Sequence, residues 1–94
     1  MRVFMPSIFI ELIGIIAGIL GVVAWIPQIK EVYIKKKHEG ISLPTLHLIC
    51  TALLLWLIYG FLISSIAIIL SNLAALSCIL SLIIGVIRLR DEEK

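Results

Sequence analysis

The chain has 94 residues, of which 62% are hydrophobic and only 15% are charged. A soluble domain of this length could not hide so much apolar surface, which excludes a water-soluble globular fold and indicates that a lipid bilayer surrounds the chain. The net charge is only +2 and the charged residues lie in clusters, so the composition gives no indication of a nucleic-acid partner.

The first apolar segment covers residues 8–29, and as a helix of about 33 Å it would cross a bilayer. Pro27 lies near its end and has no N–H, so the Val23 carbonyl loses its helical partner and the helix is expected to bend there. Gln28 brings further hydrogen-bonding groups to the same turn. A static kink at the end of the helix is the alternative interpretation. Glu11, near the other end, is interpreted as a carboxylate that reaches the lipid headgroups rather than as a proton carrier.

An uncharged stretch from residue 41 to residue 87 follows a basic loop, and it is too long for a single membrane crossing. We expect it to cross twice, as helices at about 43–63 and 66–87, with the reversal in the segment from Tyr59 to Ser65, where a glycine and paired serines weaken the helix. The sequence therefore predicts an all-α membrane protein with three transmembrane helices in a single domain, residues 1–94.

The basic residues predict how the chain lies in the membrane. Arg2 alone lies on one side of the three-helix arrangement, and the other seven basic residues lie on the opposite side. Those seven are Lys30, Lys35, Lys36, Lys37, Arg88, Arg90 and Lys94. Because cytoplasmic loops carry the excess of lysine and arginine, we expect the amino terminus outside the cell membrane and the carboxyl terminus in the cytoplasm.

Two side chains are expected at nearly the same depth, about 10 Å below the outer boundary of the membrane. Trp56 lies near the end of the second helix and Asn72 near the start of the third. An aromatic ring beside an amide can hold a neutral polyhydroxylated ring, because the aromatic face stacks on C–H groups and the amide binds hydroxyls. The alternatives are that Asn72 bonds between helices and that Trp56 only packs.

The sequence contains no pattern that indicates an enzyme, a metal site or a cofactor site. The histidines, His38 and His47, have no acid, cysteine or serine at ligand or triad spacing, and His38 is interpreted as solvated. The cysteines, Cys50 and Cys78, lie inside apolar runs and are interpreted as small packing residues.

Four motifs in a fixed order resemble a known family. They are Trp25-Ile-Pro-Gln28, Glu39-Gly-Ile-Ser42, Trp56-Leu-Ile-Tyr-Gly60 and Asn72. With them the chain resembles the SemiSWEETs, prokaryotic sugar transporters of the PQ-loop superfamily, over residues 13–87. The resemblance implies that the third helix packs between the other two, and that two chains form a parallel homodimer around a central path, as parallel repeats do in SWEET transporters.

The resemblance also implies roles for individual residues. Trp56 and Asn72 would contact the sugar, and Pro27 with Gln28 would form the hinge of the inner gate. Tyr59 would belong to the outer gate.

The chain departs from the family pattern at both gates. Relatives commonly have arginine, aspartate and proline where this chain has Ile63, Ser65 and Ala67. Closure of the outer gate would therefore rest on Tyr59 and apolar contacts. Near the inner gate, methionine and aromatic residues are replaced by Thr45, Leu46 and Ile49.

The expected activity is facilitated diffusion of a mono- or disaccharide by alternating access. No carboxylate lies at the expected membrane centre, so the sequence shows no site for coupling transport to protons or sodium, and uniport is predicted. Two alternatives remain open: a PQ-loop carrier of a non-sugar solute, and a small structural membrane subunit without transport activity.

Overall fold

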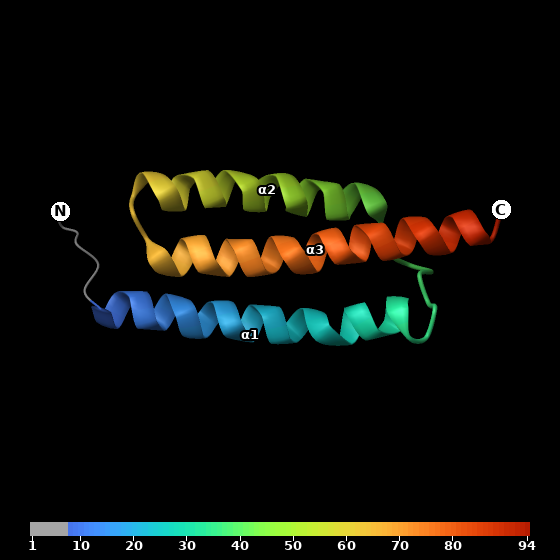
Figure 1. Cartoon of the computed structure of the whole chain (residues 1–94), viewed down its shortest axis with the longest axis horizontal. Coiled ribbons are helices and arrows are strands. Elements are labelled where there is room, and N and C mark those ends of the chain that lie inside the picture. The colour runs from blue at the N-terminus through green and yellow to red at the C-terminus, as the bar shows by residue number, and fades with distance from the viewer. Residues whose placement is uncertain (1–7) are drawn as a thin grey trace.

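A computed structural model describes residues 8–94 of the chain. It contains three helices, α1 (Ile8–Tyr33), α2 (Leu43–Leu62) and α3 (Ile66–Glu92). All three are long and apolar enough to cross a membrane, which confirms the predicted all-α membrane fold. Figure 1 shows the three helices running side by side, with α3 between α1 and α2.

Two helices extend further than the apolar pattern predicts. Helix α1 continues through Pro27 and ends four residues after the expected residue 29, and α3 ends five residues after the expected residue 87. The added segments contain lysine, arginine and glutamate, which are good helix formers and lie outside the apolar run. We call the end of the helix bundle that carries Tyr33, Leu43 and Glu92 the basic end, and the opposite end the turn end.

The turn end is built by a short reversal between α2 and α3. Ser64 adopts a left-handed conformation with φ of 56°, and α2 ends at Leu62, one residue earlier than expected. Ser65 then caps α3, because its hydroxyl accepts a hydrogen bond from the Ile68 N–H at 3.2 Å.

Glu11 of α1 binds to this same cap. Its Oε1 accepts the Ala67 N–H at 2.8 Å, and the Ser65 hydroxyl donates to both carboxylate oxygens at 3.1 Å. A negative charge is favourable at a helix N-terminus, where N–H groups lack partners. The interpretation of Glu11 as a headgroup contact was therefore wrong, because its carboxylate binds the start of α3. These partners lie more than 50 positions away in the sequence.

Small residues bring α1 and α3 close together. A Cβ atom on Gly14 would lie 2.8 Å from the Cβ of Ala67, and one on Gly18 would overlap the Ser71 hydroxyl. Such contacts are typical of membrane helices, in which small residues permit close approach of backbones. In the described part of the chain, α1 and α2 each pack on α3, and no Cα atom of α1 lies within 8 Å of a Cα atom of α2.

The buried core is concentrated at the basic end. Val32 of α1 and Leu46 of α2 pack there against α3. The members of this core on α3 are Ile79, Leu82, Ile83, Val86 and Leu89. Large apolar side chains are exposed along the rest of the helices, and hollows remain between them.

Candidate functional site

A hollow of about 420 Å³ lies between the three helices, nearer to the turn end, and we call it the central hollow. It is lined by Gly14, Ala17, Gly18, Leu53, Trp56, Ala67, Ile68, Ser71 and Asn72. The structure therefore brings Trp56 of α2 and Asn72 of α3 to one cavity, whose size lies in the range of small-molecule sites.

Asn72 is the buried polar group of this hollow. The residue is only 9% exposed, and its Nδ2 donates to the carbonyl of Ile68 at 2.7 Å. That bond lies within α3, so the residue does not link two helices in this chain. Among the hydrogen bonds of residues 8–94, none involves Oδ1 of Asn72. The amide keeps an acceptor oxygen and a second N–H for a ligand.

Trp56 is more exposed than is usual for a tryptophan in a packed helix bundle. It is 54% exposed, and its ring contacts Tyr59 edge to face with 5.5 Å between ring centroids. No hydrogen bond in the described chain uses the indole N–H. On α2, Trp56 and Tyr59 also line a separate hollow of about 310 Å³. The indole can therefore offer a surface to a ligand. A movement of the Tyr59 ring would change its contact with the Trp56 ring.

A third hollow of about 330 Å³ lies at the basic end, and we call it the basic-end hollow. It is lined by Trp25, Gln28, Gly40, Ile41, Ser42, Thr45, Leu46, Ile49 and Leu82. Gln28 lines this hollow, whereas Pro27 lines neither it nor the central hollow. Trp25 was not predicted as a site residue, although its position three residues before Gln28 places both on one helix face.

The end of α1 after Pro27 is fastened to α3. Val32 is 1% exposed, and the Tyr33 hydroxyl donates to the Ser81 carbonyl at 2.6 Å. A Cβ on Gly85 would lie 2.8 Å from Val32, so the helices are in close contact there. A bend at Pro27 would therefore act between this fastened end and the rest of α1.

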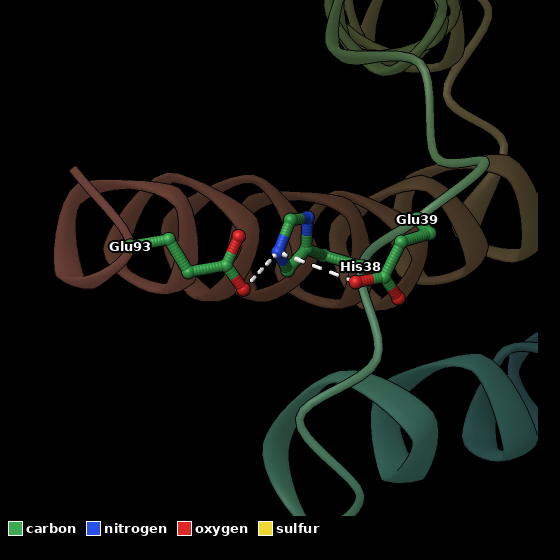
Figure 2. A group of neighbouring side chains, drawn as sticks. All are labelled: His38, Glu39 and Glu93. Atoms are coloured by element: carbon green, nitrogen blue, oxygen red, sulfur yellow. Dashed lines mark hydrogen bonds and ion pairs between the residues drawn. The ribbon is translucent and has the colours of Figure 1, made fainter.

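A cluster of charged side chains joins the loop after α1 to the end of α3. Figure 2 shows His38 between Glu93 and Glu39, with Nε2 of His38 at 2.7 Å and 3.8 Å from their carboxylate oxygens. These three side chains offer possible metal ligands within 4.8 Å of one another. However, Nε of Arg90 donates to Nδ1 of His38 at 3.2 Å.

The hydrogen bond from Arg90 determines which nitrogen of His38 carries the proton. A guanidinium only donates, so Nδ1 of His38 accepts and Nε2 carries the proton that is donated to Glu93. A metal ion would need the lone pair of Nε2, so the geometry favours a hydrogen-bonded link, which we call the loop clasp (His38, Arg90 and Glu93). His38 is 7% exposed, and its interpretation as solvated was wrong because α3 brings Arg90 beside it.

Comparison with known proteins gives three findings. The sequence pattern of the PQ loop repeat family matches residues 9–69. An uncharacterized protein of Methanocaldococcus jannaschii is 39% identical over 85 residues, which are 90% of this chain and 89% of that protein. The sugar transporter SemiSWEET of Leptospira biflexa is 35% identical over 66 residues, which are 70% of this chain and 78% of that protein.

A solved structure is also similar to this fold. It is the crystal structure of a bacterial homologue of SWEET transporters, with a TM-score of 0.80 and 39% sequence identity. The similarity covers 84% of this chain and 95% of that chain.

Proposed function

Because the chain belongs to the PQ-loop repeat family and is a SemiSWEET-type, multi-pass membrane protein, we propose that it is a sugar transporter. It would carry a neutral mono- or disaccharide down its concentration gradient by alternating access. The names of the Leptospira biflexa relative and of the structural relative support a transporter rather than an enzyme. The observation in this chain that carries the proposal is that Trp56 and Asn72 line the same hollow.

In this proposal the two side chains bind the sugar in different ways. The exposed indole of Trp56 stacks on the C–H face of the ring, while Asn72 offers its acceptor oxygen and second N–H to hydroxyls. A sugar hydroxyl could donate to Oδ1 of Asn72, which accepts no hydrogen bond from any group of residues 8–94. No charged residue lines the central hollow, which suits a neutral solute.

We propose that the working unit is a parallel homodimer. In one chain α1 and α2 lie against α3 with no Cα atoms within 8 Å of each other, so three helices leave too little interior for an enclosed solute path. Two copies related by a two-fold axis along the membrane normal would close the path and supply two Trp56–Asn72 sets.

The same arrangement suggests how the protein lies in the cell membrane. The seven lysines and arginines of residues 8–94 all lie at or beyond the basic end, and Arg2 lies outside the described residues. We propose that the basic end faces the cytoplasm and that α1 starts on the outer side.

Gating is proposed to use the two ends separately. Bending at Pro27 would move α1 relative to its fastened end and change the opening beside Gln28, which forms the inner gate. Tyr59 would serve the outer gate, and its ring contact with Trp56 would sense an occupied site. Among residues 8–94, no carboxylate lines the central hollow, and Glu11 is bound to α3. The hollow therefore offers no carboxylate to bind a coupled proton or sodium ion, which supports uniport.

Uptake into proteoliposomes that contain only this chain tests the proposal. We expect saturable uptake of radiolabelled glucose or sucrose that stops at the external concentration and is unchanged when proton and sodium gradients are collapsed. Accumulation above the external concentration would contradict uniport. Uptake equal to that of empty liposomes for both sugars would favour a carrier of another solute or a structural subunit.

A further inference from the structure

We propose that the basic-end hollow is a second binding subsite, in which Trp25 and Gln28 hold the same kind of neutral hydroxylated ring between the central hollow and the cytoplasm. The inference rests on the proposed transport of sugar. It adds a position on the path that the central pair of residues does not provide.

The two hollows are separate places in the fold. They have comparable volumes, about 330 Å³ and 420 Å³, and share no lining residue. Thr45, in the basic-end hollow, precedes Trp56 by 11 positions, which corresponds to about 16 Å along α2. A single ring could not fill both hollows, so each would be occupied in turn.

The basic-end hollow repeats the chemistry of the central one. Trp25 supplies an indole and Gln28 a carboxamide, as Trp56 and Asn72 do in the central hollow. Gln28 is exposed, and among residues 8–94 no hydrogen bond uses its side chain. Both donors and the acceptor of this amide are therefore free for a ligand.

Two hydroxyls add hydrogen-bonding capacity to the same hollow. Ser42 Oγ accepts from the Thr45 N–H at 3.2 Å and from the Thr45 hydroxyl at 2.9 Å. Because Ser42 acts as an acceptor in both bonds, its own proton remains available, and Thr45 Oγ1 can still accept. None of the lining residues is charged, so the hollow suits a neutral polyhydroxylated molecule rather than an ion.

The walls of this hollow are held in place by the rest of the fold. Leu46 and Leu82, which are 6% and 0% exposed, belong to the buried core. Arg90 of the loop clasp donates to the Ile41 carbonyl at 2.6 Å and so fixes the loop that forms one side. A site that is already formed needs less ordering when a ligand binds.

The positions of the tryptophans permit a direct test, since the chain contains only two and each hollow has one. Trp56→Phe leaves Trp25 as the sole indole, and Trp25→Phe leaves Trp56. Fluorescence of each variant is titrated with glucose and with sucrose. We expect Trp25 to respond, and Gln28→Leu to weaken the sugar affinity reported by Trp25 about tenfold while changing that reported by Trp56 less than twofold.

A matched pair of variants that each lack one hydroxyl provides a second test of the subsite. Thr45→Val removes a hydroxyl in the hollow, whereas Thr51→Val removes one on α2 that lines none of the three hollows described above. Only Thr45→Val is expected to weaken the Trp25 response.

Three outcomes would overturn the subsite. A silent Trp25 beside a responding Trp56 refutes it and leaves the proposed function intact. A Trp25 signal with the midpoint of the Trp56 signal, insensitive to both Gln28→Leu and Thr45→Val, shows that Trp25 only senses binding in the central hollow. Silence of both indoles, together with no uptake of either sugar, refutes the proposed function and the subsite with it.

Discussion

Pro27→Ala should slow sugar exchange while leaving sugar binding nearly unchanged. Pro27 lies inside α1, which continues for six residues beyond it, so the proline interrupts an interior turn rather than a helix end. An alanine would restore the hydrogen bond to the Val23 carbonyl and favour a straight helix by up to about 3 kcal/mol.

The structure indicates where this free energy would act. Beyond Pro27, Val32 is buried and Tyr33 is bonded to Ser81, so straightening would be resisted by an end that is fastened to α3. If the full 3 kcal/mol separated the two gate positions, their equilibrium would shift by about a hundredfold. Exchange between the positions would then be slow, although the central hollow is untouched.

Sugar binding and proteoliposome uptake are measured on one preparation of Pro27→Ala. We expect affinity within a few-fold of the parent and uptake reduced by tenfold or more. Ile26→Ala, an exposed change in the same turn, serves as the control and should leave uptake near the parent value. Uptake of Pro27→Ala equal to the parent would mean that Pro27 is a static kink, and loss of binding would mean that it shapes the site.

Further predictions concern the contacts that hold the helices. Glu11→Ala should lower the free energy of unfolding by roughly 1–2 kcal/mol because the α3 cap loses its acceptor, and thermal unfolding in detergent that matched the parent would contradict this role. Gly18→Ala should destabilise the α1–α3 contact, and adding Ser71→Gly should recover much of the lost thermal stability, whereas no recovery would show that the clash lies elsewhere. Arg90→Ala should increase proteolysis of the loop before α2, since it removes the bond to the Ile41 carbonyl; an unchanged cleavage rate would show that the loop is held by other contacts.

The fold could be predicted because its main determinants are local in sequence. The long apolar runs identify three spanning helices, and the uncharged stretch is too long for one crossing. The extra turns of α1 and α3 were missed because the apolar pattern marks where a helix leaves the hydrocarbon of the membrane. It does not mark where the backbone hydrogen bonds of the helix end. Charged residues such as Lys30 and Arg90 continue the helices into water.

The side-chain contacts were harder to predict because their partners are distant in the sequence. Glu11 and His38 each bind groups on α3 that lie more than 50 positions away, and neither pairing leaves a spacing pattern. The depth estimate placed Trp56 and Asn72 at one level, and they line one hollow in the structure. Their contact with sugar remains a prediction.

Sugar uptake by purified protein in liposomes, with Trp56→Ala and Asn72→Ala beside the parent, tests the account most directly. Ser77→Ala is the matched control, because Ser77 also bonds a carbonyl one turn back on α3, that of Leu73 at 3.0 Å, and lines none of the described hollows. Cross-linking in the same liposomes reports whether each variant still forms the dimer. We predict saturable uptake by the parent and by Ser77→Ala, and at least a tenfold loss in both site variants with the dimer intact. Normal uptake by Trp56→Ala and Asn72→Ala would show that the central hollow is not where this protein holds its solute.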